Sequence, residues 1–162
     1  MPSFDVVSRI DMQEVDNAIN QARKEIGTRY DFRDGTSKIE FDKKEITLLA
    51  DNKMRLEAMT EILKQKLVKR GVGVRALEFK EAEGASAGSI RQQVLLRQGI
   101  ATDDARAIVK LIKQQNLKKV QAQIQDDQVR VNGPKIDDLQ AAIAMLKEQM
   151  TKIELQFVNF KD

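Results

Sequence analysis

Apolar residues recur along the chain either with the two-residue period of a strand or with the longer period of a helix. Stretches of these two kinds follow one another in the same order in each half of the chain. From residue 3 to 82 and again from 89 to 160, stretches of period two, typical of strands, flank stretches of helical period. Each half is therefore predicted to run strand, helix, strand, strand, helix, strand. This order predicts an α+β fold of two ferredoxin-like (βαββαβ) units, each an antiparallel four-stranded sheet with two helices on one face.

Local signals set the ends of the predicted elements. Asp11 and Glu14 have the spacing of a capping box before the first helix, and Gly71 is placed to end the second helix. The small-residue stretch 83–89 has the composition of a linker. We therefore place the first unit at residues 1–86 and the second at residues 87–162.

The composition excludes several kinds of chemistry. The 162 residues include no cysteine and no histidine, so a thiol nucleophile, an imidazole base and a zinc site of these ligands are ruled out. We predict that the protein is not an enzyme and has no catalytic residue, metal site or cofactor. The lack of cysteine, of an export signal and of a long apolar stretch predicts a cytoplasmic protein without a membrane partner.

The net charge of +3 is unevenly distributed along the sequence. Residues 89–162 contain 12 Lys/Arg and 9 Asp/Glu, whereas the remaining residues contain 16 of each. The positive excess thus falls in the predicted second unit, which is compatible with a polyanionic partner.

One face of the second predicted sheet would be rich in amide and guanidinium groups. If the helices cover the apolar positions, the opposite face carries Arg91, Gln93, Arg97, Gln121, Gln123, Gln125, Gln128 and Arg130. Amides read base edges, and guanidinium groups bind phosphates or stack on rings. The equally supported alternative is a solvated face or one buried between the units. The central strands carry no aromatic residue, which gives little support to stacking of single-stranded RNA.

A second candidate site is the aromatic and charged segment 29–33. Arg29 and Asp31 can form a pair beside the rings of Tyr30 and Phe32, an arrangement able to clamp a purine. Phe32 is more simply a core residue, whereas Tyr30 is open to a functional role. Phe160 is expected on the sheet face opposite Phe157, where its ring would be available to a ligand.

Several strings of residues resemble the bacterial YajQ family from the first residue to the last. They are Met1–Ser8, Arg29–Phe32, Leu67–Gly71, Gln98–Ile100, Val120–Gln125, Gln128–Val131 and Phe157–Asp162. The resemblance implies two ferredoxin-like domains, a cytoplasmic location and nucleotide binding, without a settled catalytic activity. It also implies that strands can be exchanged between domains, in which case the N-terminal strand 3–10 would pair with the second sheet.

The resemblance and the residues together predict a non-enzymatic nucleotide-binding protein. Some members of the family are regarded as cyclic dinucleotide receptors, so a regulatory role with such a ligand is the first hypothesis. The alternative is an RNA-binding adaptor that uses the open amide face, and a protein partner is compatible with either. The candidate nucleotide-binding residues are Arg29, Tyr30, Arg91, Gln93, Gln121, Gln123, Arg130 and Phe160.

Overall fold

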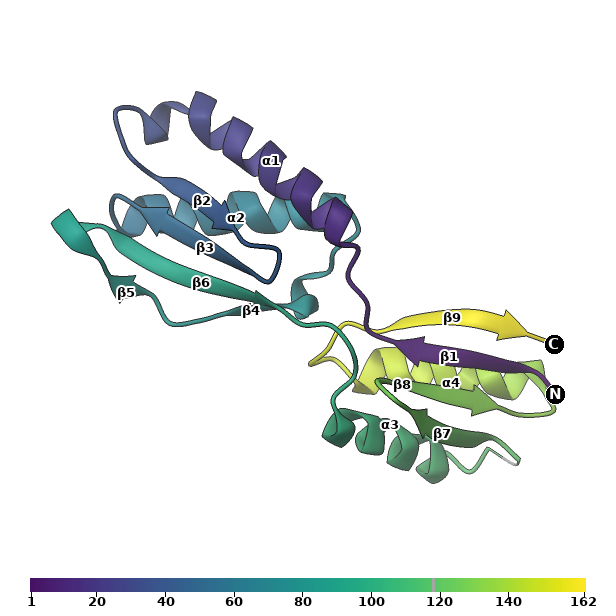
Figure 1. Ribbon diagram of the computed structural model, residues 1–162. Helices are drawn as coiled ribbons and strands as arrows, with labels where there is room; N and C mark the ends of the chain where they lie inside the picture. Colours follow the sequence, from purple (N-terminus) through teal and green to yellow (C-terminus); the bar gives the residue numbers. More distant parts are fainter. Residues whose placement is uncertain (118) are drawn as a thin grey trace. The chain divides into compact units, whose positions relative to one another are not determined.

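The computed structural model describes residues 1–117 and 119–162, which form four α-helices and two antiparallel sheets (Figure 1). The α+β class predicted from the sequence is confirmed. The chain divides into two compact units. One, which we call the split unit, consists of Met1–Arg9 and Gln98–Asp162, and the other, the inserted unit, is Ile10–Arg97.

The inserted unit places α1 and α2 on one face of its sheet (Figure 1). Its strands run in the order β2-β3-β6-β4, and the very short β5 pairs with β6 as a fifth strand that the sequence did not predict. The elements are α1 (Met12–Thr28), η1 (Tyr30–Phe32), β2 (Lys38–Phe41), β3 (Glu45–Ala50), α2 (Lys53–Lys69), η2 (Val74–Ala76), β4 (Leu77–Phe79), β5 (Glu83–Gly84), η3 (Ser86–Gly88) and β6 (Ile90–Leu96). Asp11 caps α1 by accepting hydrogen bonds from the amides of Gln13 and Glu14.

The split unit has the same architecture, but its strand β1 comes from the N-terminus of the chain, far in sequence from its other elements. Its elements are β1 (Ser3–Val7), α3 (Thr102–Gln114), β7 (Gln121–Gln125), β8 (Gln128–Asn132), α4 (Ile136–Gln149) and β9 (Gln156–Lys161). The strand order is β7-β8-β1-β9, and α3 and α4 cover one face of the sheet (Figure 1).

Two strands have therefore changed places relative to the simple tandem arrangement. β1 pairs with β8 and β9, and β6 pairs with β3 and β4. The chain does not divide between residues 86 and 87, and the stretch 83–89 folds back on β6 instead of linking units. The reason is that an alternating pattern specifies which face of a strand is buried but not which sheet the strand joins.

This division also changes the charge distribution. The split unit contains 11 Lys/Arg and 10 Asp/Glu, and the inserted unit contains 17 and 15. The small positive excess is shared, so net charge alone does not direct a polyanion to either unit.

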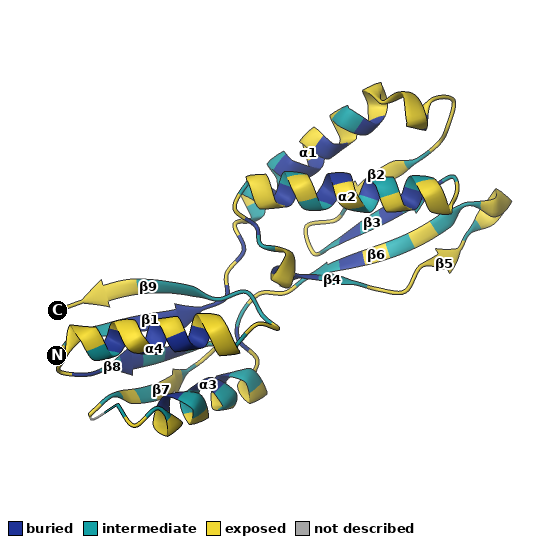
Figure 2. Cartoon of the chain, turned by 180° about the vertical axis from the view of Figure 1, so that it is seen from behind, coloured by how far each residue is buried: buried dark blue, intermediate teal, exposed yellow. Residues whose placement is uncertain are grey.

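Each unit has its own apolar core between helices and sheet. In the inserted unit Ile19, Leu48, Met59, Leu63 and Val94 are buried, and in the split unit Phe4, Val6, Ile108, Val129 and Leu146 are buried. Along the helices, Figure 2 shows buried stretches alternating with exposed ones. Each such side chain contributes about 1.5–3 kcal/mol of transfer free energy. No helix among the described residues has both the length and the apolar content needed to cross a membrane.

Candidate functional site

The predicted amide and guanidinium face is divided between the two sheets. Arg91 and Gln93 lie on β6 in the inserted unit, whereas Gln121, Gln123 and Arg130 lie on β7 and β8 in the split unit. The single face expected from the sequence does not exist, because β6 joins the sheet of β3 and β4.

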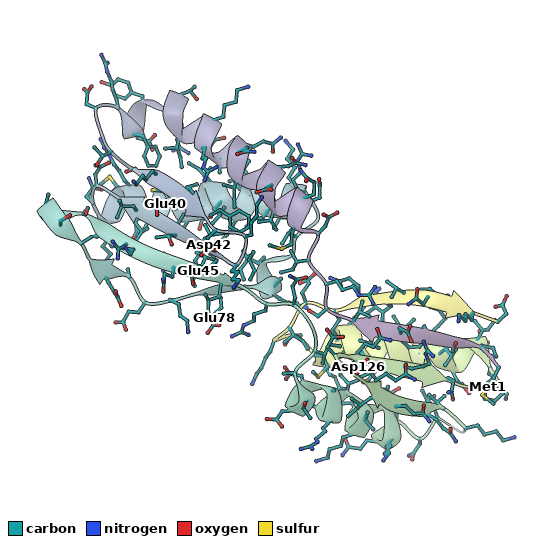
Figure 3. All side chains as sticks on the ribbon, in the orientation of Figure 1. Met1, Glu40, Asp42, Glu45, Glu78 and Asp126 are labelled. Atoms are coloured by element: carbon teal, nitrogen blue, oxygen red, sulfur yellow. The ribbon has the colours of Figure 1, made fainter. Side chains whose placement is uncertain are left out.

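On the open face of the inserted unit, Arg91 and Gln93 lie opposite Leu49 and Thr47 of β3. Shallow hollows of about 240 and 220 Å³ flank these two side chains. Glu40, Glu45 and Glu78 are on strands of the same sheet (Figure 3). Glu40 is paired with Lys38, and Glu78 with Lys80 and Arg97, so charges of both signs lie on this face. Within residues 1–117 and 119–162, no three acidic side chains are grouped so that they could hold a metal ion.

The open face of the split unit is organised around a buried carboxylate. Asp5 is 1% exposed and accepts hydrogen bonds from Arg130 Nε at 2.9 Å and Arg130 Nη2 at 3.3 Å. Asn159 Nδ2 donates a third, at 2.9 Å. The hydrogen bonds from Arg130 hold the pKa of Asp5 below its usual value. The guanidinium fork of Arg130 is therefore occupied by the protein itself, while Gln121 and Gln123 remain exposed.

Phe160 lies on the face opposite to the one expected. Between Ser3 and Asp5 on β1 the pairing advances from Lys161 to Val158 on β9, so β9 contains one extra residue. Asn159 has the positive φ of 56° at this bulge. The Phe160 ring consequently stacks on the core residue Phe4, with centroids 5.9 Å apart, and shares the helix-facing side with Phe157. Simple alternation failed here because the bulge reverses the faces.

The segment 29–33 forms the predicted arrangement of an ion pair beside two rings. Arg29 Nε donates to Asp31 Oδ1 at 2.9 Å and Arg29 Nη2 donates to Asp31 Oδ2 at 2.8 Å. The Arg29 guanidinium lies 5.8 Å from the ring centre of Phe32, which is buried as predicted. The hydrogen bonds from Arg29 lower the pKa of Asp31, so this carboxylate stays ionised at neutral pH.

Tyr30 projects from the same segment into solvent. Tyr30 is 82% exposed, which is unusual for a residue with a large aromatic side chain. The Arg33 guanidinium lies 5.8 Å from the centre of its ring. Both residues border a hollow of about 470 Å³ that is lined by residues 26–30, 32–35 and 37. The Tyr30 ring, the Arg33 guanidinium and the Asp34 carboxylate thus meet around one concave surface, together with the paired guanidinium of Arg29.

Asp51 fixes the loop that bounds this hollow. It accepts hydrogen bonds from the backbone amides of Thr36 (2.8 Å) and Ser37 (3.1 Å) and from both hydroxyl groups. Arg55 Nη1 donates to Asp51 Oδ2 at 2.8 Å, and Arg55 Nη2 donates to the carbonyl of Arg33 at 3.0 Å. These hydrogen bonds lower the pKa of Asp51, and the one from the Ser37 hydroxyl contributes most.

Gly35 allows the loop to approach the Asp51–Arg55 pair closely. A Cβ atom there would overlap Arg55 Nη1 and Asp51 Oδ2, so any other residue would displace these side-chain ends. Asp51, Arg55 and Gly35 were not predicted as parts of the site. Asp34-Gly35 is a typical turn signal, but Asp51 lies 15 positions beyond Thr36, and nothing in the local sequence pairs it with the turn.

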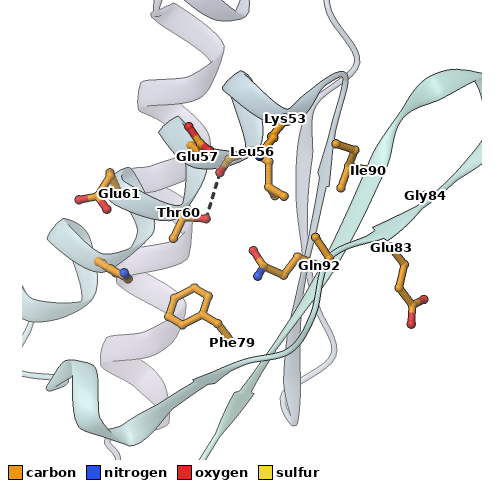
Figure 4. A pocket seen from close by; sticks show the side chains of 12 residues that line it. Lys53, Leu56, Glu57, Thr60, Glu61, Phe79, Glu83, Gly84, Ile90 and Gln92 are labelled. Atoms are coloured by element: carbon orange, nitrogen blue, oxygen red, sulfur yellow. Dashed lines mark hydrogen bonds between the residues drawn. The ribbon is translucent and has the colours of Figure 1, made fainter.

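A larger groove of about 900 Å³ lies between α2 and the segment from β4 to β6 (Figure 4). Its floor is apolar, with Leu56, Phe79 and Ile90, and the Lys64 ammonium lies 5.0 Å from the ring centre of Phe79. Carboxylates of Glu57, Glu61 and Glu83 stand among the lining residues. A phosphate-bearing ligand is therefore less suited to this groove than to the hollow beside Tyr30.

Comparison with known proteins extends over the whole chain. The family model described as "Nucleotide-binding protein YajQ-like" matches residues 2–161. A nucleotide-binding protein of Magnetococcus marinus is 54% identical over 162 residues, covering 100% of both chains. Nucleotide-binding proteins of Syntrophotalea carbinolica and Geotalea uraniireducens are 52% and 50% identical over 161 residues, covering 99% of each chain. The chain therefore belongs to the YajQ-like family of nucleotide-binding proteins.

Proposed function

We propose that the protein binds a nucleotide without transforming it, and that the base stacks on Tyr30 beside the hollow at η1. The names of the relatives support the ligand class. The location rests on one observation, the exposed Tyr30 ring flanked by Arg33 and by the Arg29–Asp31 pair. A ring this exposed is not stabilised by burial in the core, but it offers a flat surface on which a base can stack.

Each group around the hollow has a distinct part in binding. Stacking on Tyr30 contributes about 1–3 kcal/mol per base. The Arg33 guanidinium is available for a phosphate. Its contact with Asp34 spans 4.0 Å, and both side chains are highly exposed. Asp34 lines the hollow, and its exposed carboxylate can accept hydrogen bonds from the N–H groups of a guanine edge. The set favours a purine nucleotide, and guanine in particular.

A cyclic dinucleotide is the ligand class that makes best use of this set, and we propose a regulatory receptor role. It presents two bases and two phosphates, so Tyr30 and Arg33 can be engaged together. Because Asp51 and Arg55 already hold the loop, little ordering is required when the ligand binds. Such a receptor needs no nucleophile or general base, in keeping with a chain without cysteine or histidine.

An RNA-binding adaptor is the alternative, and the exposed amides of Gln121 and Gln123 are the observation that favours it. Two features weigh against it. Arg130 is engaged by Asp5, and the 59% exposed ring of Phe160 lies on the helix-facing side of the sheet, opposite the amides of Gln121 and Gln123. Binding of RNA through phosphates would weaken steeply with salt, whereas stacking on Tyr30 would not.

Calorimetric titration of the protein with cyclic diguanylate, GTP and ATP tests the proposal. We expect Tyr30→Ala to weaken binding of the preferred nucleotide at least about tenfold, the equivalent of 1.4 kcal/mol. Tyr30→Phe retains the ring and should bind as the unchanged protein does. Arg106→Ala, an exposed change on α3, is the control. Equal affinity of Tyr30→Ala and the unchanged protein would remove Tyr30 from the site.

A further inference from the structure

The edges of the two sheets differ in how well they are protected. An edge strand exposes unpaired backbone N–H and C=O groups, and proteins usually block such strands with charges, bulges or a covering side chain. At β2, Arg23 Nε and Nη2 both donate to the carbonyl of Ile39, at 3.0 and 2.8 Å. At β9 the bulge at Asn159 and the charge of Lys161 interrupt the edge. β4 is only three residues long and includes Glu78.

β7 has none of these protections along its length. Its five residues, Gln121–Gln125, include no charge and no proline. It pairs with β8 in unbroken register from Gln121↔Asn132 to Gln125↔Gln128. Ile124 at this edge is 41% exposed. Among the described edges, β7 is the one best suited to accept another strand.

The register identifies which backbone groups of β7 are unpaired. The amide of Gly133 donates to the carbonyl of Pro2, so in β8 Val129 and Val131 direct their backbone groups toward β1. Gln128, Arg130 and Asn132 therefore direct theirs toward β7, where Gln125, Gln123 and Gln121 are their partners. The N–H and C=O groups of Ala122 and Ile124 consequently point away from the sheet.

We propose that β7 is a self-association edge, at which two copies of the chain pair antiparallel about a two-fold axis through Gln123. Ala122 then forms a hydrogen-bonded pair with Ile124 of the partner subunit, and the symmetric pair completes four backbone hydrogen bonds. Gln121 faces Gln125 of the partner subunit, and no like charges are opposed. A strand without charge and with alternating amides is complementary to a second, antiparallel copy of itself. An isologous contact requires this self-complementarity.

The resulting contact is short, so association should depend on protein concentration. It would join two four-stranded sheets into one continuous sheet. On the open face the amides of the two β7 strands would meet side by side, and on the helix-facing side Ile124 would pack against Ala122 of the partner subunit. The inference concerns the split unit alone and does not depend on nucleotide binding at Tyr30.

The cysteine-free chain allows a register-specific test. Gln123 sits at the non-hydrogen-bonded position on the proposed axis, where opposed Cβ atoms are about 4.5–5.5 Å apart, close to disulfide geometry. On mild oxidation, Gln123→Cys should form a disulfide-linked dimer at least about tenfold faster than the Gln121→Cys control. A mixture of Gln121→Cys and Gln125→Cys should form the crossed dimer. Equal cross-linking of Gln121→Cys and Gln123→Cys would indicate random collision and overturn the proposal.

Sedimentation equilibrium of the cysteine-free protein provides an independent check. We expect the average mass to rise with concentration toward that of a dimer. Gln123→Lys, which places two ammonium groups at the axis on an exposed face, should remain monomeric with an unchanged circular dichroism spectrum. A monomer at the highest soluble concentration of the unchanged protein, or association undiminished by Gln123→Lys, would contradict the proposed edge.

Discussion

Asp5→Ala is expected to lower the free energy of unfolding of the split unit by about 1–3 kcal/mol, the typical cost of leaving hydrogen-bond donors without their acceptor. Asp5 lies on the central strand β1 and is 1% exposed. Its removal leaves the guanidinium of Arg130 and the amide of Asn159 without their acceptor. Hydrogen exchange of the β1 and β8 amides reports this unit separately from the other and is the measurement of choice.

The same carboxylate should make the unit sensitive to acid. Because the pKa of Asp5 is lowered in the folded state, its stabilisation is present above the ordinary carboxyl pKa of about 3.9 and is lost as pH falls through the folded pKa. Asp5→Asn should abolish this component, while Asp103→Asn, an exposed change at the start of α3, should leave it intact. If Asp5→Asn and the unchanged protein lost stability in parallel below pH 4, the account of Asp5 would be wrong.

Asp51→Ala is expected to destabilise the inserted unit by about 2–4 kcal/mol, because several hydrogen bonds to a charged acceptor are lost together. Thr36, Ser37 and Arg55 would all lose their common partner. The loop beside Tyr30 would also lose its anchor, so nucleotide affinity should fall along with stability. Urea unfolding followed by exchange of the β3 amides measures the first effect, and calorimetry measures the second.

Asp34→Asn is the matched control for Asp51→Ala, because asparagine tolerates the positive φ of 58° at this position. Asp34 belongs to the same loop, but its side chain is 93% exposed and its contact with Arg33 spans 4.0 Å. Surface pairs of this kind contribute little, so stability should stay close to that of the unchanged protein. If the two substitutions had similar effects, Asp51 would not be the anchor of the loop.

The sequence predicts the elements of this fold better than their assembly. Periodicity identifies the strands β1 and β6 and their buried faces, because apolar residues alternate with polar ones where one face of a strand is buried. It does not record that β1 joins β8 while β6 joins β3, since either strand satisfies either position. Which strands pair depends on contacts between residues far apart in the chain. This pairing determines whether Arg91 and Arg130 share a face.

The candidate site shows the same contrast. The Arg29–Asp31 pair, the buried Phe32 ring and the exposed Tyr30 ring follow from five consecutive residues, and the structure contains them. Phe160 was placed on the wrong face because a single bulge residue, Asn159, inverts the alternation. Asp51 was missed because its role arises from a contact with a turn 15 positions earlier in the chain.

Backbone amide shifts during titration with cyclic diguanylate locate the nucleotide site residue by residue. We expect the largest shifts on residues 28–37, including Tyr30 and Arg33, and Tyr30→Ala should abolish them at the same ligand concentration. Gln121, Gln123 and Arg130 should be unaffected. Shifts confined to β7 and β8, with residues 28–37 unchanged, would show that Tyr30 is not the site and would place the ligand on the open face of the split unit.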